Sequence, residues 1–97
     1  MNRLSIVHLT TQAPSRLAED LLLFGHKVFE ALAVSEVLHL QEHENIDVVL
    51  ISAEVKRAVE KEQLLRGMIL RLQPNATQAQ VEWTLSLLFP DSGSALQ

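Results

Sequence analysis

Hydrophobic and polar positions along the chain follow two periods, one typical of strands and one typical of helices. Short apolar runs rich in β-branched residues predict strands over 3–10, 26–32, 47–52 and 68–73. After each strand, apolar residues recur every three or four positions and predict helices over 14–24, 34–45, 54–66 and 77–89. Four strand–helix units in series favour a parallel sheet with right-handed crossovers, covered by helices on both faces.

The strand 47–52 carries the strongest strand signal. Its residues 48–51 are all apolar and leave no polar face, as expected of a central strand between two helix layers. The strand 68–73 tolerates Arg71 in its middle, so we expect it at an edge of the sheet.

Each predicted helix has an apolar stripe that we expect to face inward. The first helix includes Pro14 in its first turn, and Ser35 is the expected cap of the second. In the charged third helix, Glu62 and Arg66 stand at helical spacing on a solvated face. The expected inward residues are Leu17, Leu21 and Phe24; Val34, Val37 and Leu38; Val55, Ala58, Val59 and Leu65; and Val81, Leu85 and Leu88.

Composition narrows the class of protein. A chain of 97 residues, 47% hydrophobic and 21% charged, fits one globular domain over 1–89 with a polar tail, 90–97, that we expect to be disordered. A net charge of −4 argues against nucleic acid as a partner. Without cysteine there is neither a disulfide nor a thiolate metal site. No secretory signal and no apolar run of about 20 residues are present, so we expect a cytoplasmic protein without a membrane partner.

The segment "GHKVFEALAVSEVLHLQEHENIDVVLIS" (25–52) resembles the middle of the receiver domain of bacterial two-component response regulators. The segment "LRLQPNATQAQVEWTLSLL" (70–88) is similar to the last strand and helix of a receiver. The resemblance implies the flavodoxin-like (CheY-like) fold, a three-layer α/β sandwich. The interval between Ser52 and Gln73 holds only one helix and one strand, so the sheet is expected to have four strands, one βα unit fewer than in a full receiver.

The resemblance also shows which receiver chemistry is missing. Receivers phosphorylate an aspartate after the third strand, hold Mg²⁺ on an acidic pair after the first, and contact the phosphoryl group through a lysine after the last. The corresponding positions in this chain are Ser52 for the aspartate, Thr10, Thr11 and Gln12 for the acidic pair, and Gln73 for the lysine. Because these side chains carry no charge, we expect no metal, no cofactor and no phosphorylation.

Ser52 is also a candidate nucleophile in its own right. A serine needs a neighbouring base to be activated, and the sequence shows none beside it. His8 lies on the first strand and is expected to be a packed or edge residue. We therefore expect no catalytic residue.

The segment "HLQEH" (39–43) matches the H-x-x-E-H pattern of some zinc peptidases. The inward stripe of its helix places His39 and His43 on the outward or flanking side. A catalytic zinc site needs a third protein ligand and a dry cavity, and His26 on the neighbouring strand gives no obvious third ligand. We interpret the histidine pair as part of a solvated helix face.

Two classes of function remain. The first is a non-catalytic pseudo-receiver, a protein-interaction or signalling-regulatory module whose partner is a second copy of itself, a signalling kinase or a transcription regulator. The alternative is a small-molecule-binding or enzymatic domain at the strand ends. Its hydrogen-bonding groups would be Thr10, Thr11, Ser52, Gln73 and Asn75.

The absence of one βα unit indicates where a partner would bind. It leaves the strand 68–73 as an uncovered edge, which the polar side chains of Arg71 and Gln73 protect only in part against pairing with another strand. An exposed edge favours pairing with another chain, most commonly as a closed two-fold dimer. Trp83 is either a residue packed at the margin of the last helix or an anchor for the partner. The residues expected at the interface are Met68, Leu70, Trp83 and Leu87.

Overall fold

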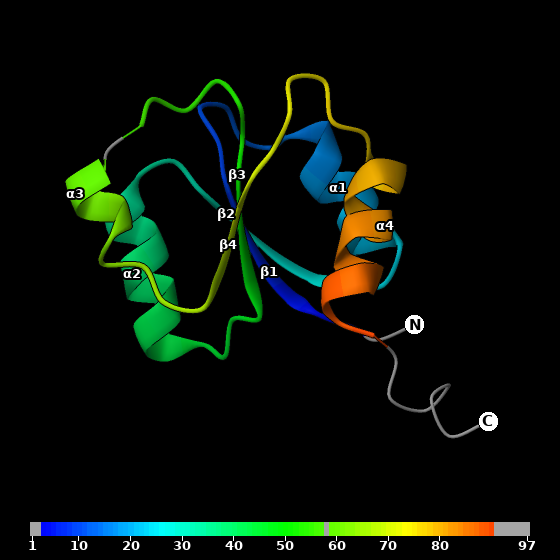
Figure 1. Cartoon of the computed structure of the whole chain (residues 1–97), viewed down its shortest axis with the longest axis horizontal. Helices are drawn as coiled ribbons and strands as arrows, with labels where there is room; N and C mark the ends of the chain where they lie inside the picture. Colours follow the sequence, from blue (N-terminus) through cyan, green and yellow to red (C-terminus); the bar gives the residue numbers. More distant parts are fainter. Residues whose placement is uncertain (1–2, 58, 91–97) are drawn as a thin grey trace.

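The chain folds into a four-stranded parallel sheet between two layers of helices (Figure 1). The computed structural model describes residues 3–57 and 59–90, so the tail 90–97 lies outside the described residues except for Pro90. In chain order the elements are β1 (Ser5–Leu9), α1 (Arg16–Leu23), β2 (Lys27–Ala31), α2 (Val34–His43), β3 (Val48–Ile51), α3 (Val59–Glu62), β4 (Met68–Arg71) and α4 (Gln78–Leu88). The strands are ordered β2-β1-β3-β4 and all pair in parallel, which confirms the flavodoxin-like sandwich.

β3 is buried on both faces, as its sequence predicts. Val48 and Leu50 join the apolar cluster under α1 and α4, whereas Val49 and Ile51 join the cluster on the opposite face, under α2. None of these four side chains is more than 1% exposed. Figure 1 shows the same division, with α1 and α4 on one side of the sheet and α2 and α3 on the other.

The third helix is much shorter than predicted, because α3 covers only Val59–Glu62 of the expected 54–66. A continuous helix would use the Val55 carbonyl as the acceptor for the N–H of residue 59. Here that carbonyl accepts a hydrogen bond of 2.9 Å from the Arg71 guanidinium. Arg71 also forms an ion pair of 3.2 Å with Glu62, the residue expected to face Arg66 across a helical turn. The apolar stripe survives in part, since Val55 and Leu65 both pack against the core.

The first helix begins two residues later than predicted, whereas the second begins at Val34 as predicted but has a different cap. α1 begins at Arg16, because the Ser15 hydroxyl oxygen accepts the Ala18 N–H and caps the helix one residue after Pro14. α2 has Ala33 as its cap, and Ser35 lies inside the helix.

Among the expected stripe residues whose burial the structure describes, three do not lie in the core; Ala58 lies outside the described residues. Phe24 and Leu88 are exposed and Leu38 is only half-buried, while Leu40, which is also half-buried, packs against the core in its place. On α4 the buried positions are Val81, Glu82 and Leu85.

A buried polar pair ties α4 to the start of β2. His26 is 2% exposed; its Nδ1 accepts the Leu4 N–H at 3.0 Å and its Nε2 lies 2.9 Å from Glu82 Oε1. Because a main-chain N–H can only donate, the ring proton is on Nε2, which donates to the carboxylate. Hydrophobic periodicity gives no signal for an inward carboxylate, which is why the sequence did not reveal this pair.

Replacing Leu50 by alanine is expected to lower the free energy of unfolding by about 2–5 kcal/mol, because the residue is fully buried between helices and sheet. The matched control is His39→Ala with His43→Ala, two exposed positions on α2 that should change stability little. Urea unfolding measures both. A larger loss from the histidine variant than from Leu50→Ala would contradict the assignment of the buried faces.

Candidate functional site

The strand order creates a switch point between β1 and β3, because the chain leaves β1 toward β2 on one side and later enters β3 on the other. In open parallel sheets, ligands bind at the carboxyl ends of the strands beside such a point. Thr10 directly follows β1 and Ser52 directly follows β3. Both are buried, at 3% and 7% exposed.

A cavity of about 160 Å³ opens at this point and brings several of the predicted residues together. We call it the strand-end cavity. Thr11 and Gln12, which the sequence placed with Thr10, do not line it and are exposed. Its lining consists of His8, Thr10, Ser15, Leu17, Ser52, Ala53, Glu54, Leu72, Gln73, Asn75 and Ala76.

His8 lies directly beside Ser52, which corrects the expectation that the serine has no base. Its Nε2 is 2.7 Å from Ser52 Oγ, and the side chain is only 1% exposed. The parallel pairing of β1 with β3 sets His8 opposite Leu50, two residues before Ser52. This proximity follows from strand register, which the sequence alone did not fix.

A second contact orients the His8 ring. Its Nδ1 lies 3.0 Å from Ser15 Oγ, and the Ser15 N–H donates to Glu30 Oε2 at 2.9 Å. Because the Ser15 hydroxyl can donate or accept, either neutral tautomer of His8 satisfies the two ring contacts. In the tautomer with its proton on Nδ1, Nε2 accepts the Ser52 hydroxyl.

Burial lowers the pKa of His8 below its ordinary value of 6.5, and the carboxylates of Glu30 and Glu54 offset this only in part. The imidazole is therefore neutral at pH 7, and one of its two ring nitrogens has a lone pair that can accept a proton. A neutral imidazole in hydrogen-bond contact with a hydroxyl has the geometry of a general base.

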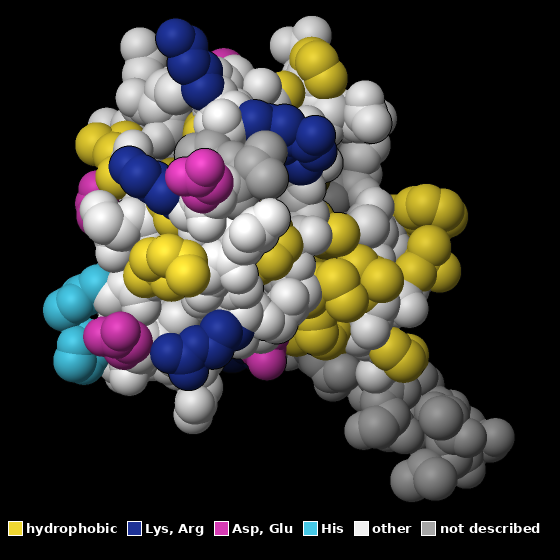
Figure 2. Space-filling model, turned by 60° about the vertical axis from the view of Figure 1, so that its left-hand side comes forward, with side chains coloured by type: hydrophobic (Ala, Val, Ile, Leu, Met, Phe, Trp, Pro, Cys, Tyr) yellow, Lys and Arg dark blue, Asp and Glu magenta, His cyan; other side chains and the backbone are white. Residues whose placement is uncertain are grey.

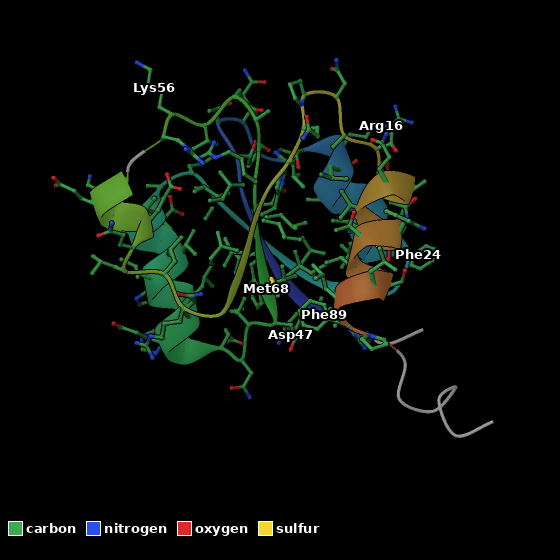
Figure 3. The ribbon with its side chains drawn as sticks, in the orientation of Figure 1. Arg16, Phe24, Asp47, Lys56, Met68 and Phe89 are labelled. Carbon is green, nitrogen blue, oxygen red and sulfur yellow. The ribbon has the colours of Figure 1, made fainter. Side chains whose placement is uncertain are left out.

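The charge around the strand-end cavity is negative. Glu54 Oε1 lies 3.3 Å from the Thr10 hydroxyl and 3.4 Å from the Thr11 hydroxyl, so the loop after β3 brings a carboxylate to the threonines. The lining includes no lysine or arginine. Figure 3 shows Arg16 and Lys56 at this end of the molecule with side chains that point away from the sheet.

The paired histidines of α2 stand apart from this cavity. His39 and His43 are exposed, with ring centroids 4.3 Å apart. Among residues 3–57 and 59–90, no group of three or more histidine, aspartate or glutamate side chains is placed to hold a metal ion. His26, considered above as a third zinc ligand, is instead hydrogen-bonded to Glu82.

A larger hollow of about 660 Å³ runs between β4 and α4. We call it the β4–α4 groove; Leu70, Leu72, Ala79 and Trp83 are among its lining residues, and Arg71 is its one charged residue. Figure 2 shows hydrophobic side chains gathered on this part of the surface. Of the interface residues predicted from sequence, Leu70 and Trp83 line the groove. Met68 and Leu87 are not part of the lining but are 37% and 62% exposed.

Contrary to expectation, the Arg71 side chain does not protect the open edge of β4 against pairing. Its guanidinium is held by the Val55 carbonyl and Glu62, on the α3 side of the sheet. Trp83 is 67% exposed, so it is not packed at the margin of α4. The edge therefore presents an apolar face beside an exposed tryptophan.

Comparison with protein-family models, curated proteins and solved structures gave no match. The receiver resemblance accordingly stays a hypothesis that rests on the residues alone. None of the helices in the described part of the chain is long and apolar enough to span a bilayer.

Stability is expected to fall on acidification through His8. Its pKa is lowered in the folded state, so the unfolded chain binds a proton more readily. The contribution of His8 to the free energy of unfolding is fully present above pH 6.5 and declines as the pH falls toward its pKa in the folded state. Thermal melts between about pH 7.5 and about pH 5.5 should show a steeper loss for the wild type than for His8→Gln. Equal slopes would contradict this assignment.

Proposed function

We propose that this chain is a cytoplasmic protein-interaction module of the pseudo-receiver kind, which acts by forming a homodimer through β4 and α4. The observation that carries the proposal is the β4–α4 groove, an apolar hollow beside the unpaired edge of the sheet. Signalling receivers act by changing their contacts with partners, and this chain offers contact surface without the acids and lysine that phosphoryl transfer needs.

The open edge of β4 offers main-chain hydrogen bonds to another strand. The Leu72 N–H bonds to Ile51 O on β3 at 2.8 Å. Since alternate residues of a strand turn their N–H and C=O groups to opposite sides, those of Ile69 and Arg71 face outward. A two-fold axis beside this edge would pair the two copies of β4 in antiparallel fashion and continue the sheet from one copy into the other.

The surface is suited to a second copy because it carries both a hollow and a projection. The β4–α4 groove is the hollow, and Trp83 on its rim is the projection. A two-fold contact requires one patch that is complementary to itself, so that the groove of each copy receives the tryptophan of the other. With Arg71 held by Glu62, no charge on the patch requires a partner of opposite charge.

Light scattering on the eluting protein is expected to give about twice the chain mass of 10.9 kDa at micromolar concentration. Trp83→Ala should weaken the dimer by about 2 kcal/mol, as for an interface hot spot. The matched control is Leu23→Ala on α1, which removes an apolar side chain that is 85% exposed and lies outside the patch. A wild-type mass that stays at one chain as concentration rises would contradict the proposal, as would equal effects of the two variants.

The same samples test independence from phosphorylation. Acetyl phosphate with Mg²⁺ should neither add a phosphoryl group to the chain nor change its assembly, because Thr10, Thr11 and Gln12 replace the metal ligands of a receiver and Gln73 replaces its lysine. A phosphoryl adduct on Ser52, or a dimer that forms only after this treatment, would point to a working receiver instead.

A further inference from the structure

We propose that Ser52 is a nucleophile for acyl transfer, with His8 as its general base, and that the strand-end cavity accepts a small uncharged acyl group from an ester. This inference goes beyond the proposed function, because it concerns the chemistry of the strand-end cavity and does not require a dimer.

The position of Ser52 suits a nucleophile. It directly follows β3, the central strand, and begins a turn in which its carbonyl accepts the Val55 N–H at 3.1 Å. A serine on a sharp turn after a central parallel strand presents its hydroxyl at the carboxyl end of the sheet, where substrates bind. Here the hydroxyl meets His8 Nε2 at 2.7 Å beside the cavity.

The base is held by a third group, as such a pair requires. Ser15 Oγ contacts His8 Nδ1, and the Ser15 N–H is fixed by Glu30. Ser15 also caps α1, so its position is set by the helix. The Glu30 carboxylate stabilises an imidazolium that forms when Nε2 takes the serine proton. Ser15 is therefore a positioning residue.

A donor for the oxyanion is available next to the nucleophile. The main-chain N–H of Ala53, the residue after Ser52, takes part in none of the hydrogen bonds found within the described chain. Ala53 itself lines the strand-end cavity. The N–H of the residue after a catalytic serine is a common oxyanion donor in sheets of this kind.

Charge and size restrict the substrate. Glu30 and Glu54 face His8 from β2 and from the loop after β3, while α1 and the segment 72–76 contribute no titratable group to the lining. The resulting negative potential disfavours phosphate esters and carboxylates. A cavity of about 160 Å³ holds a few non-hydrogen atoms, which fits an acetyl or similarly short acyl group.

The reaction proceeds in two balanced steps. Ser52 Oγ bonds to the ester carbonyl carbon while its proton passes to His8 Nε2; the carbon–oxygen bond to the leaving alcohol breaks, and the alcohol oxygen takes that proton. Water then attacks the acyl-serine and gives a proton to Nε2, and Ser52 Oγ leaves and recovers it. The net change is hydrolysis of one ester to an acid and an alcohol.

The experiment uses the full chain with p-nitrophenyl acetate and follows both p-nitrophenolate release and acetylation of peptides by mass spectrometry. We expect an acetyl group on the peptide that contains Ser52. Replacing His8 by glutamine should slow this acetylation by about 100-fold or more, as for loss of a general base. The rate should rise with pH through the lowered pKa of His8 and level off by neutral pH.

Three controls keep the result specific. Ser35→Ala removes an exposed serine, and the double variant His39→Gln with His43→Gln removes exposed imidazoles; neither should change acetylation of Ser52. With p-nitrophenyl phosphate as an anionic probe, no adduct on Ser52 is expected. Because the peptide is identified in the wild type, the test does not depend on whether Ser52→Ala folds.

The proposal is overturned if acetyl groups appear only on lysines and the N-terminus. It is equally overturned if acetylation of Ser52 is unaffected by His8→Gln in a folded variant, or if its rate keeps rising with pH well above neutrality. Each of these three outcomes leaves the dimer proposal intact, since the dimer is detected from mass alone.

Discussion

The rest of the structure depends on one constraint, the burial of β3 on both faces. Residues 48–51 are apolar on both sides, so helices must cover both faces and a strand must pair with each edge. β1 pairs with one edge of β3 and β4 with the other. This arrangement sets the positions of both candidate sites. Beside β1, the end of β3 brings Ser52 against His8; beside β4, the sheet stops and leaves its edge open.

The function proposed for each of the two sites would depend on a different physical interaction. The strand-end cavity is small, polar and negatively charged, and its function depends on the protonation of one buried imidazole. The β4–α4 groove is large and apolar, and its occupation would be driven by burial of surface such as that of Trp83. The dimer proposed for the groove should respond to substitutions that change the shape of the apolar surface. The chemistry proposed for the cavity should respond to pH.

The sequence predicted features that depend on local pattern and missed those that depend on contacts between distant residues. The four strands, the central position of β3 and the edge position of β4 follow from apolar runs and one arginine. The contact of His8 with Ser52 depends on register, and the burial of Glu82 depends on His26. The predicted helix 54–66 failed for a similar reason, because Arg71, distant in sequence, binds the Val55 carbonyl.

Hydrogen exchange at the amides of β4 tests the central claim most directly. The N–H groups of Ile69 and Arg71 face the open edge, so in a single copy they exchange rapidly even though the strand is formed. Pairing with a second copy should slow their exchange increasingly as protein concentration rises, together with that of α4 around Trp83. The amides of β2, the other edge of the sheet, should not respond. Rapid exchange of Ile69 and Arg71 at every concentration would contradict assembly through this edge.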